Sequence, residues 1–224
     1  MAPIQFGFLM VPYQALDSVG PLDVLHACSR PYLHILEQMG GPPGIADRGI
    51  DIEFHHINET MSPVTLTGRM SINPTTTCDD CPPLDYLLIG GPATFDLSPR
   101  FVEFIHEHVK RGKVLFTTCT GGIVAAAAGV LDGKNATTNH GAVPTAKHLF
   151  PKVKWTQEKQ WVVDGQFWTS GGACAGMDMM ANWVMENYDM DVAKGGFMVL
   201  DYEPRDVTKK MVFPQQRGVA NGEK

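Results

Sequence analysis

Near the middle of the chain, an apolar strand runs directly into a helix through a single cysteine. Residues 113–118 (KVLFTT) have the composition of a buried strand, Cys119 follows without a spacer, and the alanine-rich residues 123–128 favour a helix. A side chain at such a junction is held above the edge of a sheet, and the N-terminus of the helix behind it favours an anion. The junction therefore requires a fold in which a buried strand is covered by helices.

Apolar strand segments alternate with helical segments along the rest of the chain. This alternation predicts a flavodoxin-like α/β fold, with a doubly wound, mostly parallel sheet, helices on both faces and Cys119 at an elbow after a central strand. Residues 1–200 are expected to form one domain and residues 201–224 a polar extension that wraps the surface or frays. The expected strands are 4–11, 52–57, 84–89, 113–118 and the hairpin 161–169, with a short extended piece at 64–67. The expected helices are 21–28, with Pro21 in the first turn, 101–109, 123–128 and 176–188.

Charge and cysteine content narrow the function. The 224 residues contain 18 basic and 24 acidic residues, a net charge of −6, and no basic tract that could neutralise phosphates, so nucleic acid is not an expected partner. No apolar run approaches the roughly 20 residues that cross a bilayer, and the first residues lack a signal-peptide pattern, so no membrane contact is expected. The chain contains five cysteines, and an odd number argues against a disulfide framework and for free thiols in a reducing compartment. We therefore expect a cytoplasmic protein.

The carboxyl ends of parallel strands are where ligands bind in such folds, and Cys119 lies at one of them. We expect it to be a nucleophile whose pKa is lowered by the following helix; the alternative is a buried structural cysteine. Asp17 follows the first strand and lies at the same edge. It is either a proton-transfer group or the N-cap of the next helix. The backbone N–H groups of Thr120 and Gly91 are expected to stabilise a developing anion.

Other motifs point to no cofactor. Cys78 and Cys81 have the spacing of half a zinc site, but no second pair of ligands lies at a matching distance, so no metal is expected. The chain has no Walker loop, and no G-x-G-x-x-G pattern follows the first strand. We therefore expect catalysis without a metal or an organic cofactor.

Together these motifs resemble the ThiJ/PfpI superfamily, the class I glutamine-amidotransferase-like fold, over about residues 4–195. The resemblance is strongest to the branch that contains isonitrile hydratase and the amidotransferase-like domains of AraC-type regulators. It rests on Asp17 with Gly20-Pro21, on Gly90-Gly91, on residues 118–121 (TCTG), on residues 128–138 (AGVLDGKNATT) and on residues 169–178 (TSGGACAGMD).

The resemblance implies a role for each matching residue. Cys119 would be the nucleophile, Asp17 the general acid and base, and Thr120 a residue that positions water or substrate. Gly90 and Gly91 would form a turn at the substrate. The implied partners are a small-molecule substrate and a second copy of the chain in a homodimer, with no cofactor.

This sequence departs from the family pattern at two positions. Relatives commonly place histidine where this chain has Asn139, with His140 one position later, so a Cys–Asp pair is favoured over a Cys–His pair. We keep Asn139 and His140 as candidate substrate-binding residues, although surface placement of His140 is as well supported. Cys174 stands where relatives often have a small or hydroxyl residue, and a thiol in the core is expected there.

The implied activity is hydration of an isocyanide to an N-substituted formamide by a cysteine-dependent lyase. Two alternatives remain at this point. The same fold and nucleophile could act on another small electrophile, as an α-oxoaldehyde hydratase or a specialised-metabolite tailoring enzyme. The domain could also be a non-catalytic regulatory module.

Overall fold

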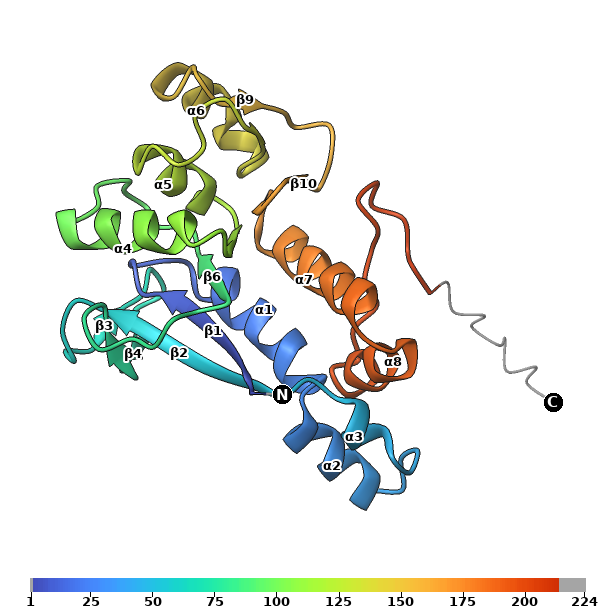
Figure 1. Cartoon of the computed structure of the whole chain (residues 1–224). Coiled ribbons are helices and arrows are strands. Elements are labelled where there is room, and N and C mark those ends of the chain that lie inside the picture. Colours follow the sequence, from blue (N-terminus) through green and yellow to red (C-terminus); the bar gives the residue numbers. More distant parts are fainter. Residues whose placement is uncertain (1, 214–224) are drawn as a thin grey trace.

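The computed structural model describes residues 2–213, and its centre is a seven-stranded sheet (Figure 1). Neighbouring strands pair in parallel, except for the antiparallel hairpin at one edge. The sheet order is β10 (Trp161–Asp164), β11 (Phe167–Ser170), β7 (Val114–Thr117), β6 (Tyr86–Ile89), β1 (Ile4–Leu9), β2 (Ile52–Asn58) and β5 (Thr76–Thr77). The predicted mostly parallel sheet and the predicted hairpin are confirmed.

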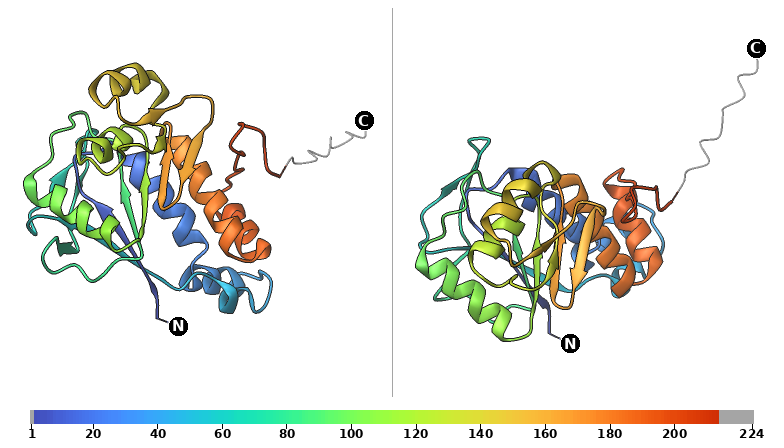
Figure 2. Two further views of the ribbon diagram at one scale, coloured as in Figure 1. Left: turned by 45° about the horizontal axis from the view of Figure 1, so that its top comes forward. Right: turned by 90° about the horizontal axis from the view of Figure 1, so that it is seen from above.

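Helices cover both faces of the sheet, as predicted (Figure 2). Leu87 and Ile89 of β6 face one apolar core, whereas Leu88 between them faces the other, so both faces of the strand are buried. The first core includes residues of α4 (Pro99–Lys110), α5 (Gly121–Ala127) and α6 (Val143–Leu149). The second includes residues of α1 (Ala15–Ala27), α2 (Arg30–Gln38), α3 (Ile45–Arg48), α7 (Ala173–Asn187) and α8 (Met190–Val199).

Two small sheets and one 3₁₀ turn complete the described fold. Two small sheets lie outside the main one: β3 (Val64–Thr65) pairs antiparallel with β4 (Ser71–Ile72), and β8 (Asn135–Ala136) pairs in parallel with β9 (Lys154–Trp155). A 3₁₀ turn, η1 (His140–Ala142), precedes α6. Within residues 2–213, no helix combines the length and apolar character that a membrane crossing needs.

The first helix begins earlier than the sequence predicts. α1 begins at Ala15, so Pro21 lies in its interior and not in its first turn. Proline has no N–H to donate to the carbonyl four residues earlier, which here belongs to Asp17. That carbonyl accepts instead from Thr118 Oγ1 at 2.7 Å. The internal proline thus leaves free a carbonyl that ties α1 to the end of β7.

The sequence-based prediction missed several helices, of which α8 shows the reason most clearly. Gly195 and Gly196 lower its intrinsic helix propensity. A Cβ at Gly196 would come within 2.3 Å of Cys28 Sγ, so the glycine allows a close approach between α8 and the end of α1. Tertiary packing therefore stabilises a helix that local propensity does not favour.

Residues after α8 are fastened to the domain by a buried carboxylate. Asp178 on α7 is fully buried and accepts hydrogen bonds from Tyr202 Oη at 2.5 Å, from Arg205 N at 3.0 Å and from Arg205 Nε at 3.0 Å. Arg205 Nη2 adds an ion-pair contact of 2.9 Å. The described part of the predicted extension therefore wraps the surface; its remaining part, 214–224, lies outside the described residues.

We expect Arg205→Ala to lower the free energy of unfolding by roughly 2–4 kcal/mol, because it leaves the Asp178 carboxylate buried without its countercharge. Urea denaturation measures this change. Arg48→Ala is the matched control, since Arg48 forms only exposed ion pairs with Asp189 and Asp191, worth less than about 1 kcal/mol. Equal small losses in both variants would contradict the assigned role of Asp178.

Candidate active site

Cys119 has a backbone conformation that is rare for a residue with a side chain. Its φ is +52°, in the left-handed region, and it stands between the end of β7 and the start of α5. Its N–H donates to Gly171 O at 2.6 Å, and its carbonyl accepts from Thr138 Oγ1 at 2.8 Å and from Asn139 N at 3.2 Å. Hydrogen bonds to its N–H and to its carbonyl therefore hold the strained residue at the predicted elbow.

The turn after Cys119 depends on a glycine. A Cβ at Gly121 would lie 2.2 Å from Ile89 O, at the end of the neighbouring strand β6. No side chain fits there, so only glycine allows α5 to begin so close to the sheet. The same close approach brings Thr120 against the turn that follows β6.

Asp17 is a fully buried carboxyl group beside this elbow. Its Oδ2 accepts from Gly91 N at 3.1 Å, whereas Oδ1 has no hydrogen-bond partner among residues 2–213. Burial raises the pKa of Asp17 to about 6, although the Gly91 N–H and a hydrogen bond with the Cys119 side chain oppose the shift. Because Gln14, and not Asp17, is the N-cap of α1, the capping alternative is excluded.

The thiol of Cys119 does not have the lowered pKa that the sequence predicts. Burial, followed by the Asp17 carboxylate, raises the pKa of Cys119, and contacts with Asn139 and Thr120 offset this only in part. The seven-residue helix α5 and its N-terminus are outweighed by desolvation and a neighbouring negative charge. The Asp17 carboxyl, which has a hydrogen bond with the Cys119 side chain, is therefore the candidate acceptor of the thiol proton.

The predicted glycines and Thr120 lie together at the turn after β6. A Cβ at Gly91 would lie 2.6 Å from Thr120 Oγ1 and 2.9 Å from Asp17 Oδ2, so this glycine allows the three groups to meet. Thr120 Oγ1 donates to Pro92 O at 2.8 Å. Because the Gly91 N–H already donates to Asp17, it is not free for the substrate anion that the sequence suggested. Gly90 packs against Ser18 and Tyr13 on the other side of the turn.

Asn139 and His140 have different surroundings although they are adjacent. Asn139 Nδ2 donates to Cys119 Sγ at 3.4 Å. The ring atom His140 Nε2 lies 3.1 Å from Lys159 O, a carbonyl on an exposed residue. The structure therefore brings Asn139 to the thiol and gives His140 a partner outside the cluster around Cys119. Sequence patterns alone did not separate these two neighbours.

The contacts made by two threonines and one carbonyl were not anticipated. Thr118 ties the α1 backbone to β7, and Thr138 and Gly171 bind the peptide groups of Cys119. None of them has a side chain whose chemistry marks it as reactive. Their contacts join positions up to 101 residues apart in the chain, and no local pattern signals such contacts.

The other cysteines are free, and their surroundings differ from that of Cys119. Burial raises the pKa of Cys28 to about 12, of Cys78 to about 11 and of Cys81 to about 12. Cys174 is exposed in the first turn of α7, so the predicted core placement is wrong there. Among residues 2–213, no group of three or more His, Cys, Asp or Glu side chains is arranged to hold a metal.

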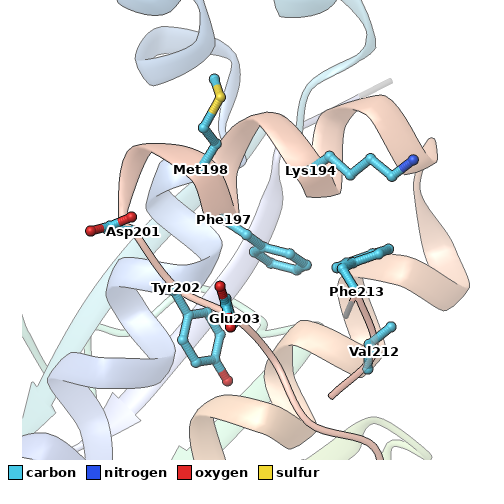
Figure 3. Close-up of a pocket in the computed structure, with 8 residues that line it drawn as sticks. All are labelled: Lys194, Phe197, Met198, Asp201, Tyr202, Glu203, Val212 and Phe213. Atoms are coloured by element: carbon cyan, nitrogen blue, oxygen red, sulfur yellow. The ribbon is translucent and has the colours of Figure 1, made fainter. Parts of the chain in front are cut away.

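A cavity of about 500 Å³ lies where the segment after α8 crosses that helix (Figure 3). Phe197, Phe213 and Val212 form much of its apolar wall, and Lys194 stands at its edge. None of its lining residues belongs to the cluster around Cys119. Its titratable lining residues are Lys194, Asp201, Tyr202 and Glu203, and no cysteine among residues 2–213 lines it. The cluster around Cys119 and Asp17 therefore remains the candidate active site.

The sheet and the strained cysteine define a flavodoxin-like α/β protein with a cysteine elbow. The chain belongs to the DJ-1/PfpI family, whose model matches residues 14–186. It is 32% identical over 208 residues to isonitrile hydratase from Pseudomonas putida, a match that covers 90% of this chain and 79% of that protein. It is 25% identical to the HTH-type transcriptional regulator CdhR from Pseudomonas aeruginosa, over 75% of this chain and 51% of the regulator.

Solved structures show the same fold. A THiJ/PfpI family protein from Pseudomonas syringae superposes with a TM-score of 0.73 at 22% identity, over 97% of this chain and 80% of that one. Drosophila melanogaster DJ-1beta superposes with a TM-score of 0.68 at 16% identity, over 90% of this chain and 99% of that one. The predicted family resemblance and the predicted fold class are confirmed.

The raised pKa of Asp17 makes a prediction about stability. The unfolded state loses this proton near pH 3.8 and the folded state near pH 6, so stability falls as the pH rises through that window. Asp17→Asn removes this penalty. We expect the variant to exceed the wild type in unfolding free energy at pH 7 by up to about 3 kcal/mol, with little difference at pH 4.

Urea denaturation at both pH values measures the effect. Asp23→Asn is the control, because Asp23 is exposed on the same helix and its replacement should change stability by less than about 0.5 kcal/mol. If Asp17→Asn is less stable than the wild type at pH 7, the carboxyl does not carry the desolvation penalty assigned to it.

Proposed function

We propose that the protein is a cysteine-dependent hydratase of isocyanides, a cofactor-free lyase that forms N-substituted formamides. The observation that carries the proposal is the buried Asp17 carboxyl, hydrogen-bonded to the side chain of a strained cysteine at a strand-to-helix elbow. The 32% identity to isonitrile hydratase over most of both chains supports this substrate class.

In the first step, Asp17 accepts the Cys119 proton and the sulfur attacks the terminal carbon of the isocyanide. The new S–C bond uses the electron pair of sulfur, and the carbon takes the proton that Asp17 holds. The product is a thioimidate in which the former isocyanide carbon carries one hydrogen. Asp17 returns to its ionised form, ready for a second proton transfer.

In the second step, water adds to the thioimidate carbon. Asp17 accepts a proton from the water as the C–O bond forms and passes it to the substrate nitrogen. The C–S bond then breaks as the new hydroxyl becomes the formamide carbonyl, and Asp17 carries the hydroxyl proton to the sulfur, which leaves with its electron pair. The net reaction adds one water to the isocyanide and releases the formamide. We propose that Thr120 positions this water or the substrate, and that Gly90 and Gly91 shape the turn beside it.

We further propose a cytoplasmic homodimer. Five free thiols, among them a cysteine whose function requires the reduced form, suit a reducing compartment. A homodimer is the assembly that the family resemblance implies. Each subunit would bind its own small-molecule substrate. Size-exclusion chromatography with light scattering tests the assembly.

A regulatory role is the second candidate, because relatives at 25% identity are HTH-type transcriptional regulators. This chain spans about half the length of those proteins. Saturable binding of an isocyanide or another small molecule without turnover would support this role. Conversion of methylglyoxal to lactate without formamide formation would instead support an α-oxoaldehyde hydratase.

We expect the wild type to convert cyclohexyl isocyanide to its formamide and Cys119→Ala to lose turnover, because Cys119 is the thiol hydrogen-bonded to Asp17. Mass spectrometry of the formamide measures the reaction. Cys174→Ser is the control and should keep wild-type activity, since that thiol is exposed on α7. Formamide formation by Cys119→Ala at the wild-type rate would exclude the mechanism.

The pH profile should report the ionisation of Asp17. The carboxylate must be ionised to accept the thiol proton, so kcat/KM is expected to fall as the pH drops below about 6. Asp17→Asn should lower kcat by about 100-fold or more and lose this acidic limb. An unchanged limb in the variant would assign the ionisation to another group.

A further inference from the structure

The side-chain amide of Asn139 contacts the sulfur of Cys119 in a fixed orientation. Its Oδ1 accepts the Gly141 N–H at 3.0 Å, in the turn that begins η1. An amide has its acceptor and its donors on opposite sides, so this bond directs Nδ2 toward Cys119 Sγ, at 3.4 Å. The orientation of the donor is therefore set by the backbone.

The backbone holds Asn139 in register with the cysteine. Asn139 N donates to Cys119 O at 3.2 Å, and Thr138 Oγ1 donates to the same carbonyl at 2.8 Å. The segment 138–139 thus binds both the peptide unit and the side chain of the strained residue. A donor that is anchored in this way needs little reorganisation when charge develops on sulfur.

The charged side chain that faces this sulfur is Asp17 on α1, and its charge opposes a thiolate. The other segments around Cys119 offer uncharged groups: Thr120 at the start of α5, the Gly171 carbonyl before α7 and the Gly91 backbone after β6. The neighbouring His140 has a different partner, since its Nε2 lies 3.1 Å from Lys159 O. Neutral donors must therefore stabilise an anion on the Cys119 sulfur. The side-chain amide of Asn139 is one of these donors.

We propose that Asn139 is a further catalytic residue, whose amide donates to the sulfur of Cys119 and stabilises the anion that attacks the substrate. Asp17 takes the thiol proton, the sulfur keeps the electron pair, and the amide keeps both of its hydrogens throughout. The inference rests on the proposed function in one respect, that Cys119 is the nucleophile. It differs from the assignment of Asn139 as a substrate-binding residue, because the group that it contacts is the nucleophile itself.

The experiment measures the rate at which iodoacetamide alkylates Cys119 between pH 6 and 9, by mass spectrometry of the modified peptide. Asn139→Ala removes the amide. Asn139→Asp keeps an oxygen to accept the Gly141 N–H but replaces the donor with a carboxylate oxygen, so it separates a contact with sulfur from a structural role in η1. Asn182→Ala is the matched control, because the Asn182 amide donates to Glu186 on α7, and the exposed Cys174 serves as the internal reference for the reagent.

We expect Asn139→Ala to slow alkylation at pH 7 by about tenfold, as loss of one charge-assisted hydrogen bond implies, and Asn139→Asp to slow it at least as much. Both profiles should shift to higher pH, whereas Asn182→Ala should stay within about twofold of the wild type. Circular dichroism and thermal melting verify that each variant is folded. Alkylation of Asn139→Asp at the wild-type rate would overturn the proposal, whether Asn139→Ala is slow or not.

This readout does not depend on the identity of the substrate. If the wild type hydrates no isocyanide but the Asn139 variants alkylate slowly, the proposed substrate class fails and the role of Asn139 stands. If isocyanides are hydrated but alkylation is unchanged in both variants, the proposed function stands and Asn139 has no role at the sulfur. In the first case, kcat with the true substrate should fall in parallel with the alkylation rate.

Discussion

The strained backbone of Cys119 is the constraint on which the rest of the site depends. A left-handed conformation at a non-glycine residue costs of order 1–3 kcal/mol and persists only where its surroundings hold it. Here the loop before α7 binds its N–H and the segment 138–139 binds its carbonyl, while Gly121 lets α5 begin against β6. Three distant stretches of chain thus fix the direction in which one sulfur points.

The second cost is electrostatic, and it decides how Asp17 and Cys119 hold charge between them. A buried carboxyl and a buried thiol each favour their neutral forms, and each disfavours the charge of the other. One negative charge shared between Asp17 and Cys119 is therefore the arrangement that the site tolerates. The neutral donors Gly91 N–H and Asn139 Nδ2 distribute this charge, one to each partner. Proton transfer between the two groups then requires no external base.

Packing of the surrounding sheet and helices offsets both the backbone strain at Cys119 and the burial of its side chain with that of Asp17. Alternate residues of β6 and β7 enter two apolar cores, so the strands that end at the site are buried on both faces. The internal proline of α1 leaves the Asp17 carbonyl to Thr118, which couples the helix that carries the carboxyl to the strand that carries the cysteine. Asp178 on α7 binds Tyr202 and Arg205, and these hydrogen bonds fasten the segment after α8 to that helix. The site is thus supported from elements that do not take part in its chemistry.

The sequence by itself determined the alternation of strands and helices, the elbow at Cys119, its place after a central strand and the presence of Asp17 at the same edge. These follow from local composition and from the rule that parallel strands end together. Only the tertiary structure decided that α1 includes Pro21, that α8 forms despite two glycines, that Cys174 is exposed and that Asn139, not His140, contacts the sulfur. The pKa values of Asp17 and Cys119 were also decided by the tertiary structure, because burial and the distance between charges arise from segments far apart in the chain. Local patterns record which residues are present, whereas their orientation and solvation depend on contacts that form only when the chain is folded.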